Sequence, residues 1–326
     1  MQRFIFSSIT TLGAIGFVLL AVFLPALTVP CALISTTLFA FVTALSHPKV
    51  TRITSQSIIA VFYIITLIVT KDPIPGLMIL LLFYPAGLAA GYCCMMKKRV
   101  NSIGAHALLY GSVFFLLVFI VYAIFSTYPD ISFTTASENI KNMFIPEIEK
   151  AISAIFGGGQ DTASEYDYIY SYEYLATLVY SYIPTVVGLW LLVSSYIASR
   201  GLKLIYKYFD QDASFMGGFS DFRVSRTGAY VYFLATIVSL FAMGSALSVT
   251  ALNFSGVMSV VLSFAGISLI SFLLELKNVS DPIRYIIIAV LLFVGLMPFG
   301  LSYLLSLVGL LDSYLDIRER LKNSGI

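Results

Sequence analysis

Long runs of apolar residues separated by short polar stretches organise this sequence. They lie at about 4–27, 29–45, 57–70, 74–96, 103–126, 174–198, 227–251, 255–275 and 283–311. A helix that crosses a bilayer needs about 20 such residues. Because backbone groups in lipid must be hydrogen-bonded within the chain, and because the runs are continuous rather than alternating, they predict helices. We expect an all-α fold, a polytopic transmembrane helical bundle of about nine membrane segments.

The last run has two interpretations. From Arg284 to Leu311 it is too long for one untilted span and too short for two full spans. Gly295, Pro298 and Gly300 interrupt its middle. One kinked helix would leave the C-terminal tail outside, whereas two half-helices returning to the same face would leave it inside. The sequence leaves both arrangements open, and with them the side of the tail.

The 46 residues from Tyr128 to Glu173 form the main polar segment, which contains eight acidic residues and two lysines. Apolar residues recur within it at helical spacing, at Ile140, Phe144, Ile148, Ile152 and Ile155. This pattern predicts a short amphipathic helical insertion that lies on the outer membrane surface or caps the bundle. We expect Ser137 to cap the helix, Pro146 to kink it or to begin a second helix, and the glycines at 157–159 to end it.

A row of alternating tyrosines follows these glycines. The tyrosines are Tyr166, Tyr168, Tyr170, Tyr172 and Tyr174, and their period of two predicts an extended stretch. Tyrosines gather at membrane interfaces because the ring is apolar and the hydroxyl favours water. The alternative is a binding role: Tyr168, Tyr170, Tyr172 and Glu173 would offer ring faces and a carboxylate to a cation or a sugar-like solute.

The lysines and arginines of the loops predict the orientation. A cytoplasmic N-terminus places thirteen of them inside and three (Lys71, Lys141, Lys150) outside, with three more in the tail. The thirteen are Arg3, Lys49, Arg52, Lys97, Lys98, Arg99, Arg200, Lys203, Lys207, Arg223, Arg226, Lys277 and Arg284. The predicted organisation is an N-terminal membrane block (1–127, five segments), an external insertion (128–173), a C-terminal membrane block (174–311, about four segments) and a polar tail (312–326).

The largest cytoplasmic loop runs from Ser199 to Arg226. Lys203 and Lys207 are four residues apart in it, which predicts an amphipathic continuation of the preceding helix, followed by a turn. A basic loop of this kind contacts anionic lipid, or it docks a soluble partner.

Composition agrees with a membrane protein. Of the 326 residues, 59% are hydrophobic and 11% are charged, compared with about a quarter charged in soluble domains. The chain has no long basic tract, so nucleic-acid binding has no support. These features indicate a multi-pass protein of the bacterial cytoplasmic (plasma) membrane, with the lipid bilayer as its main partner.

The residues that usually carry chemistry are sparse. Cys93 and Cys94 are adjacent, but no further Cys or His stands at ligand spacing, so a zinc site is not expected. No run has an acidic or basic residue at its centre, which argues against proton-coupled antiport and against acid–base catalysis within the membrane. No nucleotide-binding or hydrolase motif occurs. We expect no enzymatic activity, no cofactor and no metal. Gly87 and Gly91 form a Gly-x-x-x-Gly pattern that predicts close helix packing.

The string from Gly309 to Arg318 is the most distinctive. Asp312 and Asp316 are four residues apart on one helical face, and Asp316 is in reach of Arg320. This predicts that the last helix continues past the membrane with an exposed, salt-bridged end. The alternatives are a protein–protein contact and a cation site made by the paired carboxylates, with Asp312, Asp316 and Arg318 as the candidate residues.

With these motifs the chain resembles the YybS-like family of bacterial integral membrane proteins. The resemblance rests on the Gly-x-x-Asp-x-x-x-Asp-x-Arg ending, on Pro73-Ile-Pro75-Gly76, on Gly87 and Gly91, and on the basic Lys97-Lys98-Arg99. That family is distantly similar to the substrate-binding membrane subunits of energy-coupling-factor transporters, which capture vitamins and work with a shared ATPase module. The resemblance therefore implies solute capture without catalysis.

Two functions agree with these observations. The first is a solute-binding or transport-associated membrane protein, with a small neutral solute and other membrane or ATPase subunits as partners. It predicts a pocket in the outer half, roofed by 128–173. The second is a non-catalytic scaffold or regulator of the cell envelope, which predicts a solid bundle and an exposed contact surface on the 199–226 loop or the tail.

Overall fold

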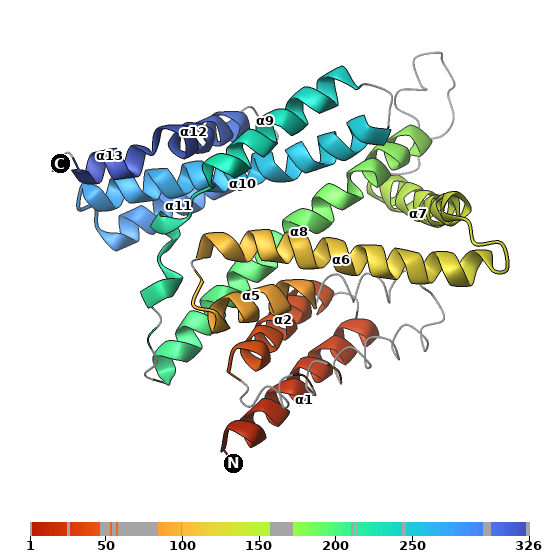
Figure 1. Ribbon diagram of the computed structural model, residues 1–326, viewed down its shortest axis with the longest axis horizontal. Helices are drawn as coiled ribbons and strands as arrows, with labels where there is room; N and C mark the ends of the chain where they lie inside the picture. Colours follow the sequence, from red (N-terminus) through yellow and green to blue (C-terminus); the bar gives the residue numbers. More distant parts are fainter. Residues whose placement is uncertain are drawn as a thin grey trace. The chain divides into compact units, whose positions relative to one another are not determined.

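The computed structural model describes residues 2–24, 27–45, 84–98, 100–156, 172–209, 214–242, 246–295 and 301–323, with Ile53, Ser57 and Asp212 as isolated positions. Every long element in these ranges is an α-helix, and no strand occurs among the described residues (Figure 1). The all-α prediction is confirmed. Three of the described helices are long and apolar enough to cross a membrane: Ser102–Ile124, Tyr174–Tyr208 and Leu247–Leu276. The number of nine membrane segments stays a prediction.

The chain divides into two compact units. Unit 1 consists of Met1–Gly111 and Gly188–Ile326, and unit 2 consists of Ser112–Val187. The long helices α6 (Val100–Thr127) and α8 (Tyr172–Tyr208) contribute to both. The candidate site described below belongs to unit 1 alone.

The N-terminal helices of unit 1 pack closely together. They are α1 (Gln2–Phe23), α2 (Thr28–Leu45) and α5 (Pro85–Met95). A Cβ on Gly87 would lie 2.7 Å from the carbonyl oxygen of Thr36, and one on Gly91 would lie 2.5 Å from that of Ala40. Only glycine permits so close a crossing of α5 and α2, which confirms the packing role expected of this pair.

The C-terminal part of unit 1 is built on α10. Its elements are two short 3₁₀ turns, η2 (Ser214–Met216) and η3 (Phe219–Asp221), and five helices: α9 (Arg226–Phe241), α10 (Ala246–Leu276), α11 (Asp281–Gly295), α12 (Leu301–Leu315) and α13 (Ile317–Asn323). Helices α9, α11 and α12 all pack against α10. A Cβ on Gly309 of α12 would lie 2.0 Å from the carbonyl oxygen of Leu262, so the backbones of α10 and α12 touch.

The predicted break between the runs 227–251 and 255–275 is wrong, because α10 passes through it. The side-chain amide of Asn253 donates to the carbonyl oxygen of Val249 at 3.0 Å, and Ser255 Oγ donates to that of Leu252 at 2.9 Å. These polar groups are therefore satisfied within the helix and need no loop.

The last apolar run forms two helices. Ile288 of α11 and Leu305 of α12 lie in one buried cluster with Ile267 of α10. In a single continuous helix those two residues would be about 25 Å apart, too far to share a cluster. The run therefore folds back on itself, which agrees with the two-helix interpretation rather than with one kinked helix.

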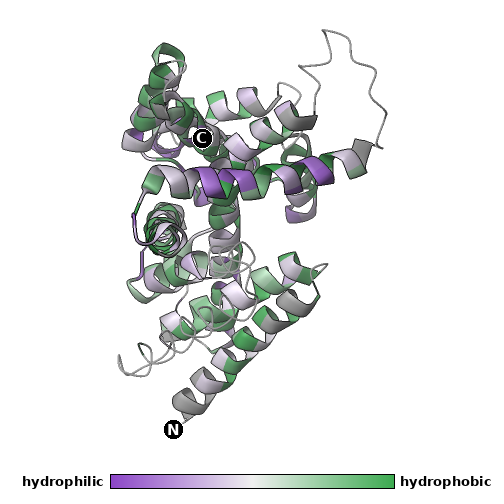
Figure 2. Cartoon of the chain, turned by 90° about the vertical axis from the view of Figure 1, so that its right-hand side faces the viewer, coloured by the Kyte–Doolittle hydropathy of each residue, from purple (hydrophilic) through white to green (hydrophobic). Residues whose placement is uncertain are grey.

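Unit 2 holds the amphipathic helix α7 (Phe133–Phe156). Hydrophilic residues interrupt its hydrophobic ones along its length (Figure 2). Phe144 lies 6.2 Å from Tyr180 of α8, and Tyr122 of α6 donates to Met143 Sδ at 3.5 Å, so the apolar side faces its own unit. The cap is Ser132, whose Oγ accepts from the backbone of Thr135 at 3.2 Å, so the prediction of a Ser137 cap is wrong. The helix also continues through Pro146.

Candidate functional site

A buried ion pair stands at the end of unit 1 that carries α13. Arg318 Nε donates to Asp312 Oδ2 at 2.9 Å, and the two side chains are only 7% and 3% exposed. Charges are buried at this level only when they are paired and hydrogen-bonded. Burial lowers the pKa of the Arg318 guanidinium and Asp312 opposes that shift, while an arginine keeps its charge at neutral pH.

The pair forms because the chain turns sharply between its two members. Asp316 has a φ of +47°, a left-handed conformation that Asp tolerates better than most residues. It ends α12 and directs the chain into α13, which brings Arg318 back over Asp312. The Asp316 carboxylate accepts a hydrogen bond from Arg226 at the start of α9. The prediction that one helix continues past Leu315 is therefore wrong, and Arg226 takes the place expected for Arg320.

The remaining donors of Arg318 hold other parts of the fold. Nη1 donates to the carbonyl oxygen of Ser220 and, at 3.2 Å, to Ser268 Oγ, while Nη2 donates to the carbonyl oxygen of Ala265 at 3.3 Å. Ser268 Oγ in turn donates to the carbonyl oxygen of Phe219 at 2.6 Å. One guanidinium thus joins α10, α12 and the η3 turn.

A polar pocket of about 560 Å³ opens beside this guanidinium. Its lining residues come from the α5–α6 loop, the 214–223 segment, α10 and α13: Lys97, Ser214, Phe215, Gly217, Ser220, Asp221, Arg223, Phe272, Arg318, Glu319 and Lys322. Four of them are basic and two are acidic, so the pocket is positively charged. Arg223 pairs with Glu319 at 3.0 Å, and Lys322 Nζ lies 5.4 Å from the centre of the Phe272 ring.

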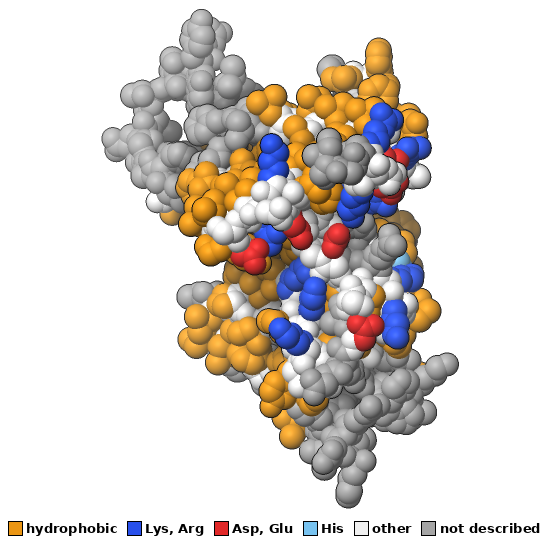
Figure 3. Space-filling view, turned by 90° about the vertical axis from the view of Figure 1, so that its left-hand side faces the viewer, with side chains coloured by type: hydrophobic (Ala, Val, Ile, Leu, Met, Phe, Trp, Pro, Cys, Tyr) orange, Lys and Arg blue, Asp and Glu red, His pale blue; other side chains and the backbone are white. Residues whose placement is uncertain are grey.

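The charged side chains form one face at this end of unit 1 (Figure 3). The 214–223 segment is held there from α8, because Arg200 Nη1 and Lys203 Nζ donate to the carbonyl oxygen of Gly217 at 3.0 and 2.6 Å. The predicted continuation of that helix is confirmed, since α8 ends at Tyr208. The 199–226 loop, the end of α10 and the tail therefore lie on the same side of unit 1.

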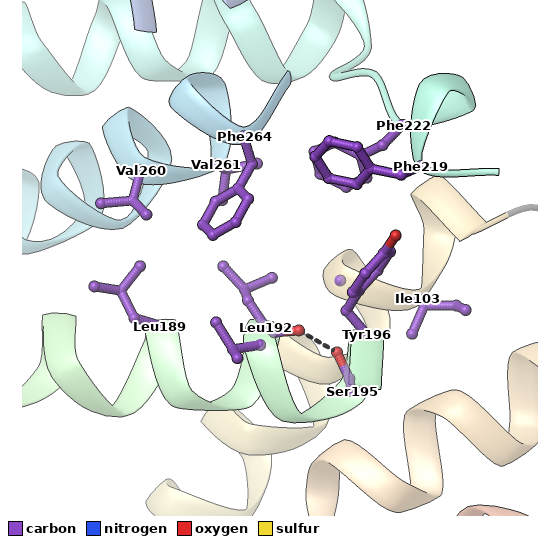
Figure 4. A pocket seen from close by; sticks show the side chains of 12 residues that line it. Ile103, Leu189, Leu192, Ser195, Tyr196, Phe219, Phe222, Val260, Val261 and Phe264 are labelled. Carbon is purple, nitrogen blue, oxygen red and sulfur yellow. Dashed lines mark hydrogen bonds between the residues drawn. The ribbon is translucent and has the colours of Figure 1, made fainter. Parts of the chain in front are cut away.

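An apolar cavity of about 110 Å³ lies on the other side of η3. Side chains of α8 and α10 point toward one another across it, and Phe219 and Phe222 close one end (Figure 4). Its few polar groups are engaged within the protein: Ser195 Oγ donates to the carbonyl oxygen of Leu192 at 2.9 Å, and the Tyr196 hydroxyl accepts from Arg200 at 2.8 Å.

The structure brings three of the candidate residues together. Asp312, Asp316 and Arg318 lie in one network, but the two carboxylates enter separate ion pairs and do not share a cation site. Tyr168 and Tyr170 lie outside the described residues. Tyr172 and Glu173 begin α8, so the predicted extended stretch is helical there. No group of three metal-ligating side chains occurs in the described ranges.

The partners of this network lie far from the tail in the sequence. Arg226 and Asp316 are 90 positions apart, and Arg318 and Ser220 are 98 apart. Arg223 and Arg226 count toward the basic loop, but nothing in the local pattern pairs them with the tail.

Comparisons with known proteins give one family. The model of a family described as a predicted membrane protein (DUF2232) matches residues 14–313. No curated protein and no solved structure matches the chain.

Proposed function

Since the family match covers most of its length, the chain belongs to the DUF2232 family of predicted membrane proteins, and we propose that it binds a small anionic solute in the polar pocket. The observation that carries this proposal is the pocket itself. Its volume of about 560 Å³ lies in the range of roughly 300–1,000 Å³ that is typical of ligand sites. The positive charge favours an anion over the neutral solute that the sequence suggested.

Two lysines are the best candidates for contact with the solute. The guanidinium groups of Arg223 and Arg318 already pair with carboxylates, whereas Lys97 and Lys322 form no ion pair with any carboxylate in the described part of the chain. Both lysines are exposed at the pocket. A bound anion would bring these two positive charges together from the α5–α6 loop and from α13.

The protein acts as a binding component without catalysis in this proposal. The two carboxylates of the pocket are occupied, because Asp221 Oδ2 accepts from the backbone of Gly218 at 2.6 Å and Glu319 pairs with Arg223. The resemblance to YybS-like proteins, a family distantly similar to the substrate-binding subunits of energy-coupling-factor transporters, supports a transport-associated role with other membrane or ATPase subunits as partners.

The proposed orientation places the charged face in the bacterial cytoplasm and residues 128–173 outside. The contacts of the tail with the 199–226 loop support this orientation, because the three tail cations then join the thirteen already assigned to the inside. Sixteen of the 19 lysines and arginines would be cytoplasmic, as the positive-inside rule favours. The solute is then bound from the cytoplasmic side, rather than under an external roof.

Binding can be measured with inorganic phosphate as the probe. We expect phosphate to raise the thermal unfolding midpoint of the full chain in neutral detergent. The double substitution Lys97→Gln with Lys322→Gln should weaken the affinity for phosphate about tenfold or more, because it removes the two pocket lysines that form no ion pair with a described carboxylate. The matched control is Lys141→Gln with Lys150→Gln, which removes two cations of α7. A wild-type midpoint that phosphate leaves unchanged would contradict the proposal.

A scaffold role is the second candidate, and the composite charged face supports it. The exposed pairs Arg223–Glu319 and Arg226–Asp316 join the loop and the tail into one surface. If the protein is a scaffold, a protein partner should co-purify with the wild type from native membranes but not with the Arg226→Gln variant. The shift in thermal unfolding midpoint caused by phosphate should then be the same in both proteins.

A further inference from the structure

The α5–α6 loop carries one of the two pocket lysines in an unusual backbone conformation. Lys97 has a φ of +50°, in the left-handed region where the ends of helices usually place glycine. The amide of Lys97 donates to the carbonyl oxygen of Cys94 at 3.0 Å, and the amide of Lys98 donates to that of Cys93 at 2.8 Å, so the loop is tied to α5. A lysine is strained in this conformation, and it stays there only where contacts on both sides of the loop hold it.

On its other side the loop is held by a histidine of α6. Lys98 Nζ lies 3.0 Å from His106 Nε2, and His106 Nδ1 lies 2.7 Å from the carbonyl oxygen of Ser102, one turn earlier in the helix. A carbonyl oxygen only accepts, so Nδ1 carries the imidazole proton and Nε2 accepts a hydrogen bond from the Lys98 ammonium. The neutral imidazole therefore holds Lys98, and with it the loop that presents Lys97 to the polar pocket.

The surroundings of the imidazole do not favour a second proton. The titratable and charged groups that the structure places beside it are Lys98, Tyr92 of α5, with ring centroids 5.8 Å apart, and Tyr110 of α6, at 6.1 Å. Lys98 also lies over the Tyr92 ring, 5.3 Å from its centre. Phenols carry no negative charge at neutral pH. Among the described residues, no carboxylate forms an ion pair with His106 or Lys98.

We infer that His106 is a positioning residue of the anion site, and that a second proton on its imidazole releases the α5–α6 loop and lowers the affinity for the anion. This inference rests on the proposed function of the polar pocket. Histidine is the side chain that gains a proton between about pH 8 and pH 5. An imidazolium has a proton on Nε2 in place of the acceptor, and its charge would face the Lys98 ammonium across 3.0 Å. Lys98 must then move away, and the adjacent Lys97 leaves the pocket with it.

The expected direction of the pH dependence opposes that of simple electrostatics. A further positive charge near the pocket would by itself strengthen anion binding as the pH falls, and so would protonation of Asp221 and Glu319, which line the pocket. Release of the loop weakens binding instead, because the pocket loses the charge of Lys97. The sign of the pH profile therefore separates a positioning role from a general effect of charge.

The pH profile is measured with sulfate, which stays a dianion over the whole range, whereas inorganic phosphate gains a proton within it. The full chain in neutral detergent is titrated with sulfate at about pH 8 and about pH 5.5. We expect sulfate to bind about tenfold more weakly at the lower pH, as for the loss of one charged hydrogen-bond partner. Equal or tighter binding at the lower pH would overturn the inference and leave the proposed function standing. If the wild type binds neither sulfate nor phosphate at pH 8, the proposed function fails as well.

Two variants of the histidine separate its hydrogen bond from its proton. His106→Gln keeps an acceptor for Lys98 but cannot be protonated in this range, so it should bind sulfate as the wild type does at pH 8 and lose nothing at pH 5.5. His106→Leu removes the acceptor and should bind about tenfold more weakly at both values. The control is His47→Gln, which removes the only other histidine of the chain and should keep the wild-type profile. A His106→Gln variant that still loses affinity at pH 5.5 would assign the titration to another group and overturn the inference.

The partner of the histidine gives an independent test. Lys98 does not line the polar pocket, yet Lys98→Met should reproduce the weak binding of the acidic state at pH 8 and abolish the pH dependence. The matched control is Lys207→Met, which removes an exposed lysine of α8 and should leave the profile unchanged. The thermal unfolding midpoint without sulfate shows that each variant is folded. If Lys98→Met binds sulfate as tightly as the wild type at pH 8, the contact does not position the loop and the inference is wrong.

Discussion

At the scale of single residues, the Arg318 guanidinium is surrounded by acceptors rather than by water. Its hydrogen bonds reach Asp312, Ser220, Ser268 and Ala265. Removing the guanidinium would leave the Asp312 carboxylate buried without its counter-charge. A buried carboxylate without a counter-charge destabilises the folded protein more than removal of both charges does.

We expect Arg318→Met to lower the free energy of unfolding by about 3–5 kcal/mol. The double variant with Asp312→Leu should recover most of that loss, because neither charge then remains buried. Urea or thermal unfolding in detergent measures both. Arg320→Met, at an exposed neighbour, is the control and should change stability by less than about 0.5 kcal/mol. A double variant no more stable than the single one would show that the charge is not the cause.

Asp316 gives a second prediction, from its φ of +47°. Asp316→Val should destabilise the protein by about 1–2 kcal/mol, because a β-branched residue is strained in the left-handed region. Asp316→Asn tolerates this conformation and loses only the partly exposed ion pair with Arg226, which is worth about 1 kcal/mol or less. Thermal unfolding of the two variants checks the order. Equal losses would mean that the ion pair, and not the backbone, determines the effect.

At the scale of elements, the contact between α10 and α12 depends on two glycines. A Cβ on Gly266 would lie 2.1 Å from the carbonyl oxygen of Leu305, and one on Gly309 would lie 2.0 Å from that of Leu262. Neither carbonyl can move without breaking its own helix. The close approach also places Asp312 within reach of Arg318, so the packing of these helices and the ion pair support each other.

We therefore expect Gly309→Val to destabilise the protein by about 2 kcal/mol or more and to weaken phosphate binding, because α12 must move away from α10. The thermal unfolding midpoint and the phosphate titration measure the two effects. The control is Gly16→Ala in α1, where an added Cβ meets nothing within 4 Å. It should leave both quantities unchanged, or raise stability slightly through helix propensity. Wild-type stability of Gly309→Val would show that the contact is looser than the structure indicates.

Elements were predictable where an unbroken apolar run requires a helix, and less so where polar side chains bond locally to the backbone. The apolar runs predict α1, α2, α6 and α8 well, because lipid leaves a helix as the only way to satisfy the backbone. The run 227–251 extends beyond α9, which ends at Phe241, into the start of α10. The boundary of α10 was missed, since Asn253 bonds within the helix in a way that hydropathy does not reveal. The cap of α7 was placed at Ser137 instead of Ser132 because both serines precede the apolar stripe.

At the scale of the whole chain, the contacts of the tail determine which loops share a side of unit 1. Arg318 and Glu319 of the tail contact Ser220 and Arg223 of the 199–226 loop. A tail on the opposite side of the membrane from this loop could not make these contacts. The last apolar run must then enter and leave on one face, as the packing of α11 and α12 on α10 requires.

Cysteine labelling of intact cells checks this arrangement. Lys207→Cys and Lys322→Cys should both resist a membrane-impermeant maleimide and react after permeabilisation, whereas Lys150→Cys should react in intact cells. The native cysteines Cys31, Cys93 and Cys94 are buried and serve as the unlabelled background. Opposite behaviour of positions 207 and 322 would contradict the contacts of the tail. Labelling of both in intact cells would instead reverse the proposed orientation.

The amino-acid sequence by itself determined the class of this protein. Continuous apolar runs and the uneven distribution of Lys and Arg depend only on local composition, because the bilayer acts on each segment separately. The string that ends in Arg318 could also be singled out, although its residues were expected to be exposed. Only the tertiary structure decided that Arg318 is buried, that Asp312 and Asp316 belong to different ion pairs, and that two cavities meet at η3. Except for the Asp312–Arg318 pair, whose members are six positions apart, these features depend on contacts across some 50 to 98 positions, and such contacts form only when distant segments pack together.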